Sequence, residues 1–301
     1  MAGRLYVSPN YMTDAMDSLV TKSLSLSGNE SLIFSSDGYT VSPASALRLK
    51  IPTNKHCDNS AAWLDDDVVN TVICQVIAGD RKLLSRLKRA DIPEHAARKA
   101  QREQAISHIE GLVAYTSLQV SMLVGTREHP PEKKYVVTNV ARRLMRLDCA
   151  RFAQRAVKKV LFPSHVSGNH WVLFWVDIGN AEVMFYDPMG GTLFSNKEYH
   201  AVAWNIARYM AAFEKMWEAA RDVVEQSIYP PFTFNDSSNP PQLRDDSCAS
   251  LPRQTNSWDC GVLIWDQCAR QFAPWRMRGG ANSSSSRNTY LRVKGAVTRI
   301  T

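Results

Sequence analysis

Hydrophobic and polar positions follow two different periods along the chain, and the change between them separates expected helices from expected strands. From residue 68 onward apolar pairs recur every four residues behind the acidic run 65–67, which predicts an amphipathic helix ending near Gly79. Helix-favouring sequence continues at 94–109, and a further helix is predicted at 139–156. The sequence therefore predicts mainly helices between residues 68 and 156.

The pattern then changes to apolar runs of strand length. These runs are 157–162, 170–178 and 182–186, with turns expected at 163–169 and 179–180. The run from 170 is almost continuously apolar, as in a strand buried on both faces of a sheet. The sequence predicts that 170–178 and 182–186 form an antiparallel hairpin inside the core.

Helical sequence returns at the C-terminal side. A long helix is predicted over 199–226 and an apolar helix over 260–272, with mostly loop between them at 229–253, which holds four prolines. We expect three parts: an irregular N-terminal extension (1–60), a main domain (61–275) and a flexible tail (276–301). Insertions are expected near 80–150 and 227–251 of the main domain.

Composition and charge narrow the function classes. The chain has 301 residues, 45% hydrophobic and 22% charged, which is typical of a globular protein with a sizeable core. No apolar stretch approaches the roughly 20 residues of a membrane span. No secretory signal follows Arg4, so an intracellular location, nuclear or cytoplasmic, is expected. The net charge is +7, but basic residues are interspersed with acids, which favours solvated helix faces over nucleic-acid binding.

The cysteines argue against a structural metal site. None of the six forms a C-x-x-C pair, so neither zinc nor a disulfide framework is indicated. Most are expected to be buried thiols, and no metal or organic cofactor is predicted. A cysteine with a special role has to be identified from its neighbours.

A histidine and an aspartate are predicted to meet on the hairpin. His170 opens one strand and Asp187 follows the next. If the two strands pair antiparallel, the start of the first lies beside the end of the second. An imidazole beside an orienting carboxylate is the arrangement that a general base requires.

Cys260 occupies a loop-to-helix junction. The N–H groups and dipole of a helix N-terminus stabilise a thiolate and can hold an oxyanion. Gly261 leaves room for a substrate backbone, and the side-chain amide of Gln254 can donate to the same oxyanion. A lone cysteine is usually a small buried hydrophobe, so the argument depends on Cys260, His170, Asp187 and Gln254 together.

These motifs resemble the catalytic core of the ubiquitin-like-protein proteases, the SUMO-specific (sentrin-specific) cysteine peptidases. The resemblance spans about residues 60–275 and rests on five segments: Trp63–Asn70, Lys158–Pro163, Gly168–Asp177, Phe185–Gly190 and Gln254–Gly261. The combined spacing of His, Asp, Gln and Cys is more specific than any single motif.

The resemblance implies an α+β, papain-like fold with a central, mostly antiparallel sheet flanked by helices. It implies that Cys260 is the nucleophile, His170 the general base, Asp187 its orienting partner and Gln254 the oxyanion donor. Trp171 and Trp63 would line the narrow channel for the modifier's Gly-Gly tail. The implied activity is cleavage after that tail in SUMO-like precursors or conjugates, by an enzyme expected to be monomeric.

Three alternatives remain open at this point. The chain could act on another modifier, Nedd-like or ubiquitin, or be a protease of a mobile element with an unknown substrate. It could also be a non-catalytic module that binds a modifier, although the intact set of four residues argues against this. A basic nucleic-acid-binding protein is supported by the net charge alone.

Overall fold

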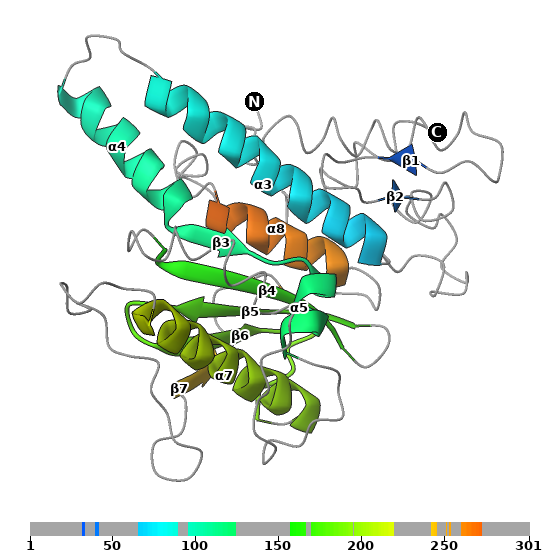
Figure 1. Ribbon diagram of the computed structural model, residues 1–301. Coiled ribbons are helices and arrows are strands. Elements are labelled where there is room, and N and C mark those ends of the chain that lie inside the picture. Colours follow the sequence, from blue (N-terminus) through cyan, green and yellow to red (C-terminus); the bar gives the residue numbers. More distant parts are fainter. Residues whose placement is uncertain are drawn as a thin grey trace. The chain divides into compact units, whose positions relative to one another are not determined.

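The computed structural model describes the chain in separate segments (Figure 1). They are residues 32–33, 40–41, 66–89, 96–124, 157–166, 170–194, 196–219, 242–245, 251, 253 and 260–272. The chain divides into two compact units, Met1–Ile109 with Pro252–Thr301 and Glu110–Leu251. Each unit is considered by itself.

A five-stranded mixed sheet forms the centre of the Glu110–Leu251 unit. Its strand order is β3-β4-β5-β6-β7. The strands are β3 (Leu112–Ala114), β4 (Lys159–Val166), β5 (His170–Asp177), β6 (Glu182–Tyr186) and β7 (Gln242–Asp245). The central pairs β4–β5 and β5–β6 are antiparallel, whereas β3 and β7 join the two edges in parallel. The predicted α+β class and the antiparallel centre are confirmed.

Two helices cover one face of this sheet. They are α5 (Ser117–Val124) and α7 (Lys197–Ala219), and Figure 1 shows both on the same side of the strands. The start of α7 is fixed by Asn196, whose Oδ1 accepts a hydrogen bond from Glu198 N at 2.8 Å. A side-chain oxygen at this N-cap position satisfies an amide that the helix itself leaves without a partner.

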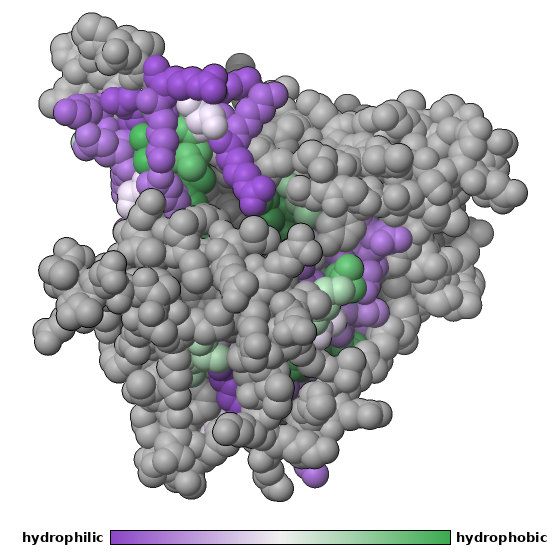
Figure 2. All heavy atoms as spheres, in the orientation of Figure 1, coloured by the Kyte–Doolittle hydropathy of each residue, from purple (hydrophilic) through white to green (hydrophobic). Residues whose placement is uncertain are grey.

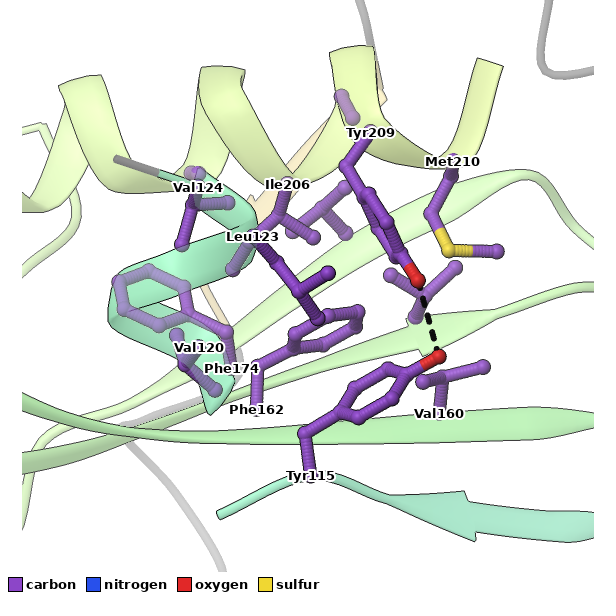
Figure 3. Close-up of a cluster of buried hydrophobic side chains, with 14 of the residues drawn as sticks. Tyr115, Val120, Leu123, Val124, Val160, Phe162, Phe174, Ile206, Tyr209 and Met210 are labelled. Carbon is purple, nitrogen blue, oxygen red and sulfur yellow. Dashed lines mark hydrogen bonds between the residues drawn. The ribbon is translucent and has the colours of Figure 1, made fainter. Parts of the chain in front are cut away.

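Aromatic side chains fill the space between the sheet and α7 (Figure 3). Phe162 of β4 has no solvent exposure, and its ring lies 5.3 Å from that of Tyr115 and 6.1 Å from that of Tyr209. The hydroxyl groups of Tyr115 and Tyr209 hydrogen bond to each other at 3.0 Å, as the dashed line in Figure 3 marks. Buried hydroxyls that are paired in this way avoid the cost of desolvation without a partner.

Replacing Phe162 with alanine is expected to lower the free energy of unfolding by about 3–5 kcal/mol, because it removes a fully buried ring and leaves a cavity between the sheet and α7. Urea denaturation would measure the loss. Phe194→Ala is the matched control, since Phe194 is 65% exposed and its truncation is expected to change stability by less than about 0.5 kcal/mol. Equal losses in the two variants would contradict this view of the core.

The other unit is described mainly as three helices, α3 (Asp66–Arg89), α4 (Ala96–Glu110) and α8 (Cys260–Phe272), with the short antiparallel pair β1 (Leu32–Ile33) and β2 (Thr40–Val41). Helix α3 packs against α8. Val69 and Ile73 of α3 and Ile264 of α8 are buried, as the four-residue apolar period predicts. Helix α4 is tied to α3 by Arg102, which donates to the carbonyl of Leu87 at 3.2 Å.

Hydrophilic side chains cover the outward surface of α3 and α4 (Figure 2). The exposed basic residues there are Arg81, Lys82, Arg86, Lys88, Arg89 and Lys99. These basic residues are accessible to solvent, and the choice between a solvated helix face and nucleic-acid binding stays a prediction. None of the helices in the described segments combines the length and the apolar character needed to cross a membrane.

The structure corrects several predicted boundaries. Helix α3 continues ten residues past Gly79, because the charged helix formers that follow outweigh the roughly 1 kcal/mol cost of one glycine. The apolar sequence 110–124, which follows the helix-favouring segment 94–109, divides into β3 and α5. Strand β4 runs through Pro163, predicted as a turn; β3 pairs with β4 only as far as Leu161, so the missing N–H of Pro163 breaks no bond to β3.

Strand β7 lies within the segment 229–253, which was predicted to be mostly loop. Its four residues alternate between exposed and half-buried, so no apolar run marks it in the sequence. The helix predicted at 139–156 and the tail 276–301 lie outside the described residues, as does the N-terminal extension apart from β1 and β2.

Candidate active site

A tight turn after β6 sets the position of Asp187. Gly190 N donates to the Asp187 carbonyl at 2.9 Å, which closes a four-residue turn with Pro188 at its second position. Aspartate first, proline second and glycine fourth is the preferred composition of a type I turn. Gly190 has a positive φ of 84°, a conformation that suits glycine because it has no side chain to clash.

His170 and Asp187 meet as the predicted hairpin requires. In the antiparallel register Leu173 pairs with Tyr186, so Asp187 continues opposite Val172, and His170 lies two residues further along β5 on the same face. His170 Nε2 and Asp187 Oδ1 are 2.7 Å apart. The Asp187 side chain is 2% exposed and that of His170 12% exposed. A short hydrogen bond in this protected place fixes both the imidazole tautomer and the ring orientation.

Three further groups donate hydrogen bonds to the Asp187 carboxylate. Met189 N donates to Oδ1 at 2.7 Å, Gly191 N to Oδ2 at 3.1 Å and the Tyr199 hydroxyl to Oδ2 at 3.3 Å. Each carboxylate oxygen therefore has two hydrogen-bond partners: His170 and Met189 N at Oδ1, and Gly191 N and Tyr199 at Oδ2. A buried carboxylate held by several donors keeps its orientation, because each donor replaces a hydrogen bond that water can no longer supply.

Sequence reasoning missed Gly191 and Tyr199. The Gly190-Gly191 pair just after the Asp187-Pro188 dipeptide is a signal that the backbone approaches another group closely. An ideal Cβ at position 191 would lie 2.3 Å from Asp187 Oδ2. Tyr199 carries no comparable signal, because its contact with Asp187 depends on how α7 packs against the sheet.

Replacing Gly191 with alanine is expected to lower the free energy of unfolding by about 1–3 kcal/mol, because the new methyl group displaces the buried carboxylate. Thermal and urea unfolding would measure the change. Gly179→Ala is the matched control at the opposite end of the same hairpin, where the added Cβ would meet Asp177 Oδ1 at an ordinary contact distance of 3.4 Å. A destabilisation of equal size at both positions would contradict the steric explanation.

Cys260 is the first residue of α8, as predicted, and is buried with 2% exposure. Gly261 follows it in the first turn and is also buried. The first turn of α8 contains no acidic residue. The positive end of the helix dipole at Cys260 is therefore not neutralised by a carboxylate of that turn. Cys260 belongs to the helical unit and the His170–Asp187 pair to the unit with the sheet.

Of the remaining predicted site residues, the structure describes only Trp171. Trp171 is 1% exposed, and its indole stacks on the His165 ring with the ring centres 4.8 Å apart. Gln254 and Trp63 lie outside the described residues. Within the segments that the structure describes, no three His, Cys, Asp or Glu side chains form a cluster suited to a metal ion.

The chain matches a known protease family. The sequence model described as "Ulp1 protease family, C-terminal catalytic domain" matches residues 113–272, just over half of the chain. This range includes His170, Asp187 and Cys260. The comparison with curated proteins found no match.

Solved structures support the same fold. The yeast C-terminal Ulp1 protease domain in complex with Smt3, the yeast ortholog of SUMO, has 15% identity and a TM-score of 0.50, covering 95% of this chain and 93% of that chain. The SUMO protease Ulp1 with its catalytic cysteine oxidized to a sulfonic acid has 14% identity and a TM-score of 0.52 at the same coverage. At these identities the likeness establishes the fold.

Proposed function

The chain belongs to the Ulp1 protease family and is a cysteine peptidase, and from this premise we propose that it cleaves after the C-terminal Gly-Gly of a SUMO-like modifier. Its substrates are precursors or conjugates of that modifier. The observation that carries the proposal is the 2.7 Å hydrogen bond between His170 and Asp187 within the segment that matches the family. It supplies the oriented base that a thiol nucleophile needs.

The proposed reaction begins with proton transfer from the Cys260 thiol to His170. Because Nε2 faces Asp187, Nδ1 is the ring nitrogen that accepts the proton. The thiolate attacks the carbonyl carbon of the terminal glycine and forms a tetrahedral oxyanion. Gln254 and backbone N–H groups at the start of α8 stabilise that oxyanion.

The intermediate then collapses, and the bond to the leaving amine breaks as His170 returns its proton to the nitrogen. The modifier is left as a thioester on Cys260. A water molecule, deprotonated by His170, hydrolyses the thioester and releases the free carboxylate and the thiol. Asp187 stabilises the imidazolium that forms in each half of the proposed reaction.

The proposed specificity for glycine rests on the two tryptophans. Trp171 follows the base directly, and its indole is held flat against His165. Together with Trp63 it would leave a channel too narrow for any residue with a side chain. A SUMO-like partner is supported by the family and by the solved Ulp1 domain in complex with Smt3.

Covalent labelling would test the proposed function. The purified protein is mixed with SUMO, a Nedd-like modifier or ubiquitin, each carrying a thiol-reactive electrophile at its C-terminus, and the products are read by intact mass. We expect an adduct with SUMO that is lost in Cys260→Ala. Cys268→Ala is the matched control, because Cys268 is a buried cysteine of the same helix and its removal should leave labelling intact.

Each other outcome has a definite meaning. An adduct with ubiquitin or the Nedd-like modifier alone would replace the proposed partner while keeping the chemistry. An adduct that persists in Cys260→Ala would overturn the assignment of the nucleophile. Absence of any adduct, with binding of SUMO retained, would identify a non-catalytic binding module.

A further inference from the structure

The Asp187 carboxylate has two differently supported oxygens. Oδ1 faces His170 Nε2 and Met189 N, whereas Oδ2 accepts from Gly191 N and the Tyr199 hydroxyl. The amides of Met189 and Gly191 belong to the backbone directly after Asp187, so they restrain the carboxylate within its own chain segment but shift together with that segment. Of the two groups that donate to Oδ2, Tyr199 is the one that comes from a separate element, α7.

The position of the Tyr199 ring is fixed independently of Asp187. Tyr199 is the third residue of α7, in the first turn that follows the N-cap Asn196. Its ring packs on Phe185 of β6, with the ring centres 5.0 Å apart and the planes inclined by 39°. The residue is 7% exposed. Helix and sheet together therefore hold the hydroxyl against the carboxylate.

The hydroxyl remains a donor over the whole working pH range. Burial raises the pKa of Tyr199 above its ordinary value, and the negative charge of Asp187 and the hydrogen bond to it raise it further. Nearby Gly191 has no side chain that would separate the ring from the carboxylate, since a Cβ there would lie 3.5 Å from Tyr199 Cε2. The Tyr199 ring is therefore held in place, its hydroxyl is protonated, and no side chain at position 191 lies between it and the carboxylate.

We propose that Tyr199 is a positioning residue, which holds Oδ2 of Asp187 so that Oδ1 stays directed at His170. The proposal rests on the proposed function for its kinetic consequence, since it assigns Asp187 as the partner of the catalytic base. Without the hydroxyl, the carboxylate keeps the donors of its own chain segment but loses the donor from α7, so Asp187 and the backbone after it can shift together away from the line to Nε2. The imidazole would then be less well oriented when it accepts the proton from Cys260.

Tyr199→Phe tests this role, because it removes the hydroxyl and keeps the ring on Phe185. With SUMO bearing a C-terminal fluorogenic amide, we expect kcat to fall about three- to tenfold with KM unchanged, as for the loss of one hydrogen bond felt in the transition state. Tyr209→Phe is the matched control. It removes a buried, hydrogen-bonded hydroxyl from the same helix, but one whose partner is Tyr115.

A double substitution separates positioning from general destabilisation. If Tyr199 acts through Asp187, then Tyr199→Phe has no further effect on kcat when Asp187 is already alanine. A merely structural role would produce the same fold loss in both backgrounds. That result, or an equal loss of kcat in Tyr209→Phe, would overturn the proposal.

A spectroscopic measurement needs no substrate and so separates this proposal from the proposed function. The proton between His170 Nε2 and Asp187 is expected as a low-field proton NMR resonance, assigned by its loss in His170→Gln. We expect it to shift or broaden in Tyr199→Phe and to be unchanged in Tyr209→Phe. An unchanged resonance in both would refute the positioning role, even if the wild-type protein cleaves SUMO. A change confined to Tyr199→Phe would support that role, even if SUMO is not cleaved.

Discussion

Replacing Cys260 with alanine is expected to lower the turnover of a SUMO substrate by at least about a thousandfold, because the variant lacks the thiol that we propose as the nucleophile. Cleavage of a SUMO precursor, followed by gel or mass spectrometry, would measure the loss. Binding of SUMO should persist, since alanine removes only a sulfur atom at a buried helix start. The expected pattern is therefore loss of kcat with retained affinity.

The control for this variant is Cys268→Ala in the same helix. Cys268 is buried to a similar degree, so its truncation reports the cost of losing a thiol from α8 without touching the chemistry. We expect turnover close to that of the wild type. Wild-type turnover in Cys260→Ala, or an equal loss in Cys268→Ala, would contradict the role of Cys260.

Replacing Asp187 with asparagine is expected to lower kcat by up to about 10⁴-fold, the loss that the same substitution causes at the aspartate of a Ser-His-Asp triad. All four described contacts of this carboxylate are donors, two at each oxygen. The amide of asparagine has a single oxygen, so its NH₂ group must face either His170 or the donors at Oδ2. Either choice sets donor against donor and disturbs the imidazole.

Asp177→Asn provides the matched control at the other end of β5. Its carboxylate also accepts from a neighbouring turn, from Asn180 N and Nδ2, each at 3.2 Å, but these bonds are exposed to solvent. Water can replace them, so we expect kcat to stay within about twofold of the wild type. Steady-state kinetics of the two variants side by side would decide the matter, and equal losses would argue against a special role for Asp187.

The parts of the fold that sequence predicts well are those specified by local pattern. Strand β6 and helix α8 have the predicted bounds, Glu182–Tyr186 and Cys260–Phe272. Each is an apolar run with a strong stop signal beside it, such as Asp187-Pro188 or Pro274. The meeting of His170 and Asp187 followed from these bounds together with the antiparallel rule.

The parts that sequence does not reveal depend on contacts between distant segments. Strand β7 is short and polar, and it exists as a strand because its backbone pairs with β6. The contact of Tyr199 with Asp187 likewise depends on where along the strands the first turn of α7 packs against the sheet. Neither feature leaves a periodic signal, since one side chain or four backbone groups are too few to create one.

The donor set around Asp187 has a consequence for how activity and stability trade against each other. Catalytic residues are often held at the expense of stability, so removing them commonly stabilises an enzyme. Here the side chain proposed to orient the base also accepts hydrogen bonds from the backbone amides of Met189 and Gly191, so folding and the proposed function make the same demand on one residue. Substitution of Asp187 is therefore expected to lower stability as well as activity. Stabilising variants should be sought outside residues 187–191.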